Sequence, residues 1–96
     1  MNKKMQSLKR IKFCLENDMV NYDGLLKNKY GKFCVIGCLF DDELLEELIL
    51  RGENNTNALT LFSRYPGISR ETGLSDYEAN VIQFYYDGRR DRKSVV

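Results

Sequence analysis

Apolar residues recur every three or four positions near the start of the chain, at Met5, Leu8, Ile11, Leu15 and Met19. This spacing places them on one face of a helix. It predicts an amphipathic helix from about Lys3 to about Asp18, with the basic residues Lys9, Arg10 and Lys12 mostly off the apolar face.

The next segment contains two short apolar pieces, Leu25-Leu26 and Phe33-Cys34, on either side of the sequence KNKYG. A connection of a few residues that contains glycine is typical of a β-hairpin. The pattern therefore predicts one small hairpin across this connection, after the first helix.

The run from Cys34 to Leu50 is too long for a strand and is rich in leucine and glutamate, which favour helices. It predicts one helix that is buried at its start and amphipathic later, with Gly52 as a left-handed cap at its end. Glycine inside a helix costs about 1 kcal/mol relative to alanine. We therefore expect Gly37 to mark the close approach of a neighbouring backbone.

Two further helices are predicted in the second half of the chain. Thr56 or Asn57 caps a short helix over ALTLFSRY, which Pro66-Gly67 ends. A Ser-x-x-Glu capping box at Ser75–Glu78 begins the last helix, which ends at Asp87-Gly88. Its inward face is predicted to carry Tyr77, Val81, Phe84 and Tyr85, whereas Gln83 and Tyr86 point elsewhere.

The fold class that follows is mainly α: one compact domain over residues 1–88 with about four helices, one short hairpin between the first two, and a basic tail over 89–96. The predicted core consists of Leu8, Ile11, Leu15, Phe33, Cys34, Val35, Cys38, Leu39, Leu45, Leu48, Leu61, Phe62, Leu74, Val81, Ile82 and Phe84.

Charge is distributed unevenly along the 96 residues, although the net charge is only +1. Residues 1–34 carry eight basic and three acidic side chains, and residues 35–60 carry one basic and six acidic side chains. These charges either form solvated helix faces that meet in the fold or form a dipolar surface that steers a charged partner. No signal peptide or membrane-spanning run is visible, so we expect a cytoplasmic protein without a membrane partner.

Cys34 and Cys38, four residues apart, raise the question of a metal or redox site. The chain has no histidine and only Cys14 as a third thiol, whereas structural zinc usually takes four such ligands. A mixed site with the acids at 41–43 is the weaker alternative, and buried cysteine packs as a small hydrophobe. We therefore expect core cysteines, with no metal and no cofactor.

Catalytic motifs are also missing from the sequence. Without histidine the chain cannot form a Cys-His or Ser-His pair, and its glycines fit no phosphate-binding loop. The carboxylates between Asp41 and Glu47 are more typical of a solvated helix face. The sequence therefore predicts that the protein is not an enzyme.

Phe33, Cys34, Gly37 and Asp41 match a segment of the form [FY]-C-C-x-G-x-x-C-D, although Val35 replaces the second cysteine and the later cysteine stands at Cys38. A second block consists of Gly73, Leu74, Ser75, Asp87 and Gly88. In these two blocks the chain resembles a group of small uncharacterised proteins encoded by tailed phages and prophages. The helix that usually follows the second block is missing here, and the family offers no catalytic residues to carry over.

This resemblance, the small size and the lack of catalytic groups predict a non-enzymatic accessory protein in the host bacterial cell. It would bind and inhibit a host or anti-phage-defence protein, and self-association is a further use of the same surfaces. Tyrosine and arginine are enriched at binding hot spots. The expected contact residues are Tyr86, Arg89, Arg90 and Arg92 near the end, and Glu43, Glu46 and Glu47 in the acidic run.

Two alternatives remain open. Nucleic acid could bind the basic ends through Lys9, Arg10, Lys12, Arg89, Arg90 and Arg92, although the near-neutral charge is unusual for that function. Alternatively, a pocket lined by Arg64, Arg70 and tyrosines could sequester a small signalling nucleotide.

Overall fold

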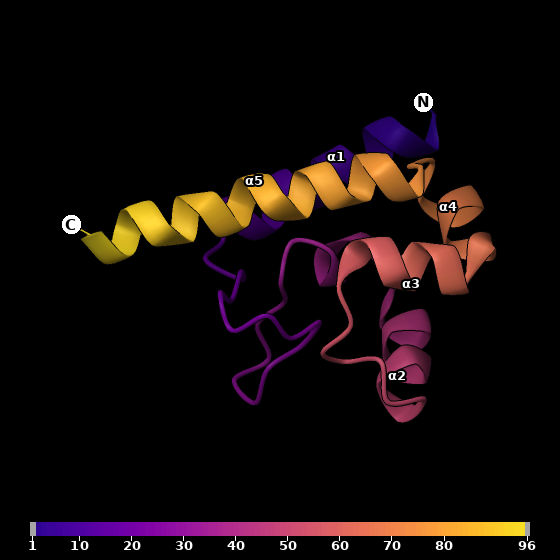
Figure 1. The fold of residues 1–96 in the computed structure, drawn as a ribbon, viewed down its shortest axis with the longest axis horizontal. Helices are drawn as coiled ribbons and strands as arrows, with labels where there is room; N and C mark the ends of the chain where they lie inside the picture. The colour runs from indigo at the N-terminus through magenta and orange to yellow at the C-terminus, as the bar shows by residue number, and fades with distance from the viewer. Residues whose placement is uncertain (1, 96) are drawn as a thin grey trace.

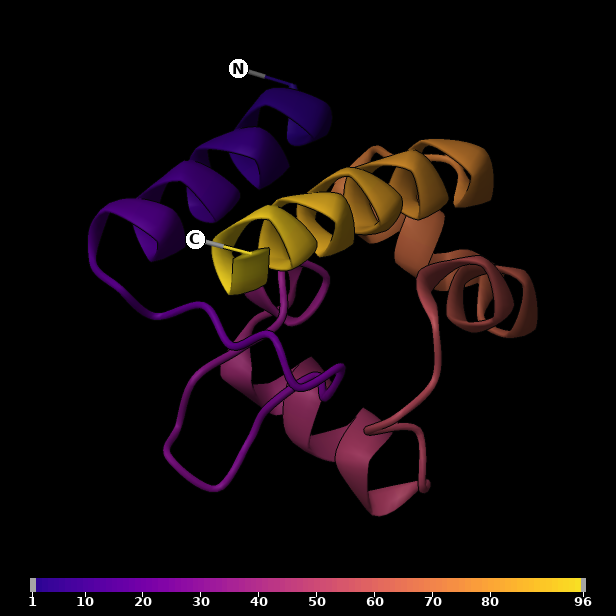
Figure 2. The same ribbon diagram turned by 60° about the vertical axis from the view of Figure 1, so that its left-hand side comes forward.

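The computed structural model describes the backbone of residues 2–95 and the side chains of residues 2–86. In chain order the elements are α1 (Lys3–Glu16), the short 3-10 helix η1 (Gly37–Leu39), α2 (Asp42–Leu50), α3 (Ala58–Arg64), α4 (Pro66–Thr72) and α5 (Asp76–Val95). Helices α1 and α5 lie on one side of the molecule and α2 on the other, with α3 and α4 between α2 and the start of α5 (Figures 1 and 2). The mainly helical class is confirmed, with five α-helices in place of about four.

Helix α1 forms close to where the sequence predicts it. The Asn2 side chain caps it by accepting a hydrogen bond from the Met5 amide, and Ile11 and Cys14 are buried. The buried Ser7 hydroxyl donates to the Thr72 carbonyl oxygen at 2.7 Å, which ties α1 to the end of α4. Leu8 is exposed instead of buried, so the inward face of α1 is narrower than its apolar periodicity indicates.

The predicted hairpin is not formed in the described part of the chain. Phe33 makes isolated bridges, one antiparallel with Lys27 and one parallel with Val20. The side chain of buried Asn21 donates to the carbonyl oxygens of Leu25 and Lys32, at 3.1 and 2.7 Å. These side-chain bonds organise the segment as a compact loop, because they satisfy carbonyl groups without a strand ladder.

The predicted single helix over 34–50 is wrong. The chain forms the turn η1, becomes extended at Phe40, and then begins α2 after Asp41, whose carboxylate accepts from the Leu44 amide at 2.8 Å. Aspartate at an N-cap favours a new helix start over continuation of an old one. The predicted cap at the other end is confirmed, since Gly52 has a φ of 83°.

Residues 57–72 form two short helices where the sequence predicts one. Asn57 caps α3 as expected, by accepting from the Thr60 amide. Pro66 does not end the helical region: it occupies the first turn of α4, where its missing N–H costs nothing. Gly73, at a φ of 73°, ends α4 in the left-handed region.

Helix α5 begins with the predicted capping box. The Ser75 hydroxyl accepts from the Glu78 amide, and the Glu78 carboxylate accepts from the Ser75 amide. The helix does not end at Asp87-Gly88 but continues to Val95. It packs on α3, where the Gln83 side chain accepts a hydrogen bond from the Ala58 amide at 2.8 Å.

The predicted inward face of α5 is wrong. Tyr77, Val81, Phe84 and Tyr85 are exposed, whereas Ala79 is fully buried and Ile82 and Tyr86 pack against the core. A small residue at position 79 lets α5 approach the body closely, and this contact turns the larger side chains outward. The hydrophobic spacing alone indicated the opposite face.

Most of the predicted core is confirmed. Ile11, Cys34, Val35, Cys38, Leu39, Leu45, Leu48, Leu61, Phe62 and Leu74 are buried, and Leu15, Phe33 and Ile82 are partly buried. The errors are Leu8, Val81 and Phe84, which are exposed. Further buried side chains that the sequence did not single out include Leu26, Ile36, Phe40 and Ile68. No helix in the described part of the chain is long and apolar enough to cross a bilayer.

Gly37 makes the close backbone approach that the sequence predicts. A Cβ atom at this position would lie 2.1 Å from the carbonyl oxygen of Leu26, which is itself buried. The contact is between two backbone segments, so rotation of a side chain cannot relieve it. Gly37 therefore holds η1 against the loop that precedes it.

We expect Gly37→Ala to lower the free energy of unfolding by about 3 kcal/mol, because the added methyl group overpacks two backbone segments. The thermal midpoint should fall by more than about 10 °C, as followed by circular dichroism. Gly67→Ala is the matched control, since its Cβ would meet nothing closer than an Arg70 nitrogen at 3.9 Å. Equal midpoints for the two variants would contradict the close-packing role of Gly37.

Candidate functional site

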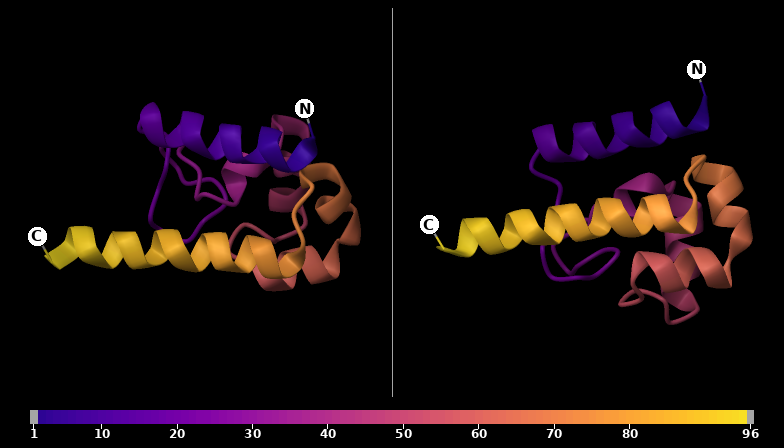
Figure 3. Two further views of the ribbon diagram at one scale, coloured as in Figure 1. Left: turned by 90° about the horizontal axis from the view of Figure 1, so that it is seen from above. Right: turned by 45° about the horizontal axis from the view of Figure 1, so that its top comes forward.

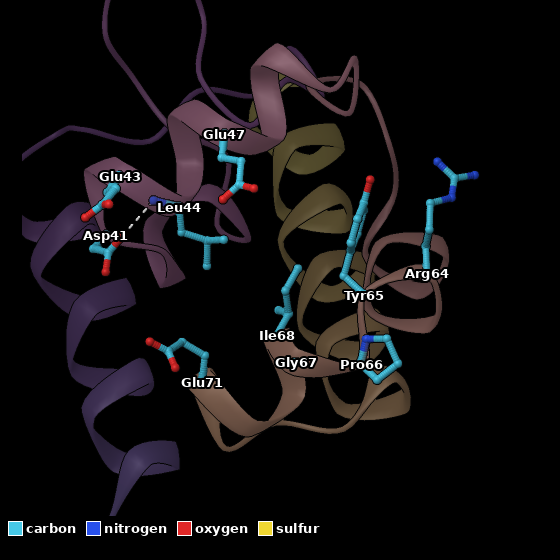
Figure 4. Close-up of a pocket in the computed structure, with 10 residues that line it drawn as sticks. All are labelled: Asp41, Glu43, Leu44, Glu47, Arg64, Tyr65, Pro66, Gly67, Ile68 and Glu71. Carbon is cyan, nitrogen blue, oxygen red and sulfur yellow. Dashed lines mark hydrogen bonds between the residues drawn. The ribbon is translucent and has the colours of Figure 1, made fainter.

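An open cleft of about 530 Å³ lies between α2 and α4. Its lining includes four carboxylates, from Asp41, Glu43, Glu47 and Glu71, together with the aromatic ring of Tyr65 (Figure 4). The side chains of Leu44 and Ile68 provide apolar surface between the acids. A concave surface with a partly apolar lining and a few converging polar groups is the usual form of a binding site.

The local sequence explains why the acids gather here. Asp41 caps α2, and Asp42 and Glu43 occupy its first turn, where the positive end of the helix dipole favours acids. Glu71 is different, because it lies near the C-terminal end of α4, where the helix dipole disfavours a negative charge. Local helix stability therefore does not account for the acid at position 71.

Two arginines near the cleft, Arg64 and Arg51, already have carboxylate partners. Arg64 lines the cleft, but its guanidinium points away from the four acids in Figure 4 and donates to both oxygens of Glu53, at 2.6 and 2.7 Å. Glu53 is a buried carboxylate, with its side chain 8% exposed. Arg51 bonds Glu47 at 2.8 Å and lies 5.7 Å from the centre of the Tyr65 ring.

The salt bridge of Glu47 raises the pKa of Arg51, and the hydrogen bond with Tyr65 contributes to the same shift. The guanidinium is therefore held in its charged form and compensates one of the four carboxylates. Among the described residues, Asp41, Glu43 and Glu71 form no salt bridge, and the Asp41 carboxylate accepts only the capping hydrogen bond of α2. The cleft therefore keeps an excess of negative charge.

The structure brings together only some of the predicted contact residues. Glu43 and Glu47 line the cleft, whereas Glu46 lies beside Leu45 and Lys27 at a different hollow. Tyr86 is partly buried in a groove between α1 and α5. Positions 89, 90 and 92 belong to α5, but the side chains of Arg89, Arg90 and Arg92 lie outside the described residues.

The basic residues of α1 do not line this cleft, but Lys3 and Arg10 share an adjoining hollow with Asp41 and Glu71. Lys12 is 3.8 Å from Glu16, and the Arg10 guanidinium donates to the Leu39 carbonyl oxygen at 3.2 Å. Arg70 does not line the cleft either. The two arginines proposed for a nucleotide pocket therefore do not converge on it.

Sequence reasoning missed the α4 side of the cleft, including Tyr65, Ile68 and Glu71. The missed signal was the order of turn residues, because Pro66 at a helix start and Gly73 after a helix end define a helix of seven residues between them. Because Pro66-Gly67 was interpreted as the end of the preceding helix, the helix that begins at Pro66 was not predicted. The acids of α2 were then predicted without the surface that faces them.

The three cysteines behave as core residues. Cys14, Cys34 and Cys38 are all buried, none is in a disulfide, and Cys34 Sγ accepts a hydrogen bond from the Gly37 amide at 3.3 Å. Burial strongly raises the pKa of the Cys38 thiol, and a hydrogen bond with Cys14 adds to the shift. Within the described residues no cluster of three or more cysteine or acidic side chains could hold a metal ion.

We expect the native protein to react slowly with iodoacetamide at pH 8, because the raised pKa keeps Cys38 protonated and the thiolate is the reactive form. Mass spectrometry after short labelling should find most of the Cys38 population unmodified. The same protein unfolded in guanidinium should be labelled at all three cysteines. Rapid native labelling of Cys38, at the unfolded rate, would contradict a packing role.

The Arg64–Glu53 pair is expected to be structural. Arg64→Met should lower the free energy of unfolding by about 2 kcal/mol, because a buried carboxylate loses its charged partner. Lys12→Met is the control, since its pair with Glu16 is exposed and should be worth less than about 0.5 kcal/mol. Urea titration measures the free energy of unfolding of both variants. Equal values for the Arg64 and Lys12 variants would show that Arg64 is not structural and is available for other binding.

The chain was compared with protein-family models, with curated proteins and with solved structures. None of the three comparisons gives a match. The chemistry of the cleft itself is therefore the basis on which its function is inferred.

Proposed function

We propose that the protein is a non-catalytic binding protein whose acidic cleft holds a basic segment of a partner protein. One observation supports this most directly: four carboxylates, from α2 with its cap Asp41 and from α4, line one cleft. Among the described residues, the one cation in its lining, Arg64, is bonded to Glu53. A lysine or arginine side chain would find acids around it and the aliphatic surface of Leu44 and Ile68 for its methylene groups.

The nature of the partner rests on the resemblance to tailed-phage and prophage proteins. That resemblance supports a host or anti-phage-defence protein in the bacterial cytoplasm, inhibited by occupation of its basic surface. Charge complementarity of this kind steers association and selects partners. The missing histidine supports binding over catalysis.

The two alternatives receive less support from this cleft. Its carboxylates would repel the phosphates of a nucleic acid or of a signalling nucleotide. Nucleic acid binding would use the basic ends of the chain instead: α1, which carries five basic residues and one acid between Lys3 and Glu16, and the arginines at 89, 90 and 92. An assay of the cleft should therefore include a DNA probe.

We expect the full chain to bind a fluorescein-labelled arginine-rich decapeptide in an anisotropy titration at low salt. The double variant Glu43→Gln with Glu71→Gln should weaken binding at least tenfold, because it removes two cleft acids from opposite walls. Glu46→Gln is the matched control, an exposed acid on the same helix that does not line the cleft.

The proposal would be overturned if the wild-type chain did not bind the peptide. It would also be overturned if the cleft variant and the Glu46 variant lost equal peptide affinity, because equal losses would indicate non-specific attraction to the acidic helix. Tighter binding to a labelled DNA duplex than to the peptide, with a steep salt dependence, would instead assign the function to nucleic acid binding by the basic ends.

A further inference from the structure

Two cysteines from different parts of the chain meet in the core. Cys14 lies in the last turn of α1 and Cys38 lies in η1. Figure 3 shows α1 as one unbroken helix, with the chain turning from its end into the loop that leads to η1. A hydrogen bond joins the two thiol side chains. The fold therefore brings together two thiols that are far apart in the sequence.

Contacts of the neighbouring residues hold this pair in place. The Arg10 guanidinium, one turn before Cys14, donates to the carbonyl oxygen of Leu39 at 3.2 Å. On the other side of η1, Gly37 lies directly against the backbone of Leu26. Helix α1 and η1 are therefore fixed against each other at the level of the two sulfur atoms.

A hollow of about 440 Å³ reaches the pair from the surface. Cys14 and Cys38 both line it, and the side chains of Phe13 and Met19 contribute apolar surface. Cys34 does not line this hollow. Although Cys14 and Cys38 are each only 6% exposed, a small uncharged oxidant can approach them through it.

We propose that Cys14 and Cys38 form a reversible disulfide when the protein meets a peroxide, and that this bond locks α1 to the buried segment 34–40. One thiolate attacks a peroxide oxygen and the O–O bond breaks, which leaves a sulfenic acid and, with the proton of that thiol, one water molecule. The second thiolate then attacks the sulfenic sulfur and displaces hydroxide, which takes the second proton. The two sulfur atoms together lose two electrons, and hydrogen peroxide is reduced to two molecules of water.

The third cysteine is the less suitable partner for Cys38. Cys34 Sγ accepts a hydrogen bond from the Gly37 amide at 3.3 Å, within its own turn. A disulfide between Cys34 and Cys38 would close a loop of one turn, whereas one between Cys14 and Cys38 closes the whole connection from α1 to η1. The longer loop gives the larger stabilisation, because it restricts the unfolded chain more.

Burial also sets the rate of this chemistry. Because burial raises the pKa of Cys38, little of its thiolate is present at neutral pH, and the thiolate is the reactive form. The pair should therefore respond to sustained oxidation and not to a brief exposure. The inference does not depend on the acidic cleft, which α2 and α4 form.

Peptide mapping of the full native chain after incubation with hydrogen peroxide tests the pairing. Trypsin leaves Cys14 in the peptide 13–27 and both Cys34 and Cys38 in the peptide 33–51. Without reduction, these two peptides should be found linked, and their fragment ions should place the bond at Cys38. Cys34→Ser should keep the link and Cys38→Ser should lose it, with circular dichroism showing that each variant is folded.

The thermal midpoint of the oxidised protein tests the lock. It should rise by at least about 5 °C and return to its starting value with dithiothreitol, which does not reverse methionine oxidation. Native protein that yields no linked peptides, or a bond that fragment ions place at Cys34, would overturn the proposal. An unchanged or lowered midpoint in the linked protein would overturn the lock.

Discussion

Seven consecutive residues, Cys34 to Phe40, are buried. The rest of the structure depends on which groups form hydrogen bonds with their backbone. A buried peptide group needs a hydrogen-bond partner in place of water. The Cys34 amide donates to the Leu25 carbonyl oxygen, the Cys38 amide to the Cys34 carbonyl oxygen, and the Leu39 carbonyl oxygen accepts from Arg10. One central segment thereby holds the loop before it and α1 beside it.

The same segment positions the candidate site. Phe40 is extended, so the chain leaves the core before α2 begins at the surface, after its cap Asp41. In one continuous helix from Cys34, the positions of the acids around the helix would have been fixed relative to those of the buried residues. Instead, the break presents Asp41, Glu43 and Glu47 to α4, whose Ile68 is anchored in the core. The acidic cleft is therefore a consequence of the break at Phe40 and Asp41.

The sequence predicted local structure correctly where a side chain acts on the backbone of neighbouring residues. The capping box at Ser75–Glu78 and the left-handed Gly52 were predicted, and Asn57 was one of two predicted caps, because each needs only neighbouring residues. The close approach at Gly37 was also predicted from its cost in a helix. Its partner, Leu26, could not be, because that contact depends on tertiary structure.

The prediction failed where two local signals compete, and where tertiary packing determines which face of a helix is buried. Asp41 is both a good cap and an acceptable helix residue, and its capping role prevailed because Phe40 is buried in an extended conformation. Helix α5 has large apolar side chains on more than one face, and contact through Ala79 decided which face is exposed. For the candidate site, Glu43 and Glu47 were among the predicted contact residues, whereas the wall formed by α4 was not predicted and Glu46 lies at a different hollow.

Native-state hydrogen exchange followed by NMR tests most directly whether the segment 34–40 organises the fold. The amides of Cys34, Cys38 and Leu39 should exchange only through global unfolding, with exchange free energies equal to the unfolding free energy measured in denaturant. The Gly31 amide, bonded to Asn28 in an exposed turn, should exchange through small local openings. Exchange of the 34–39 amides at the rate of Gly31, well below the global free energy, would contradict the account.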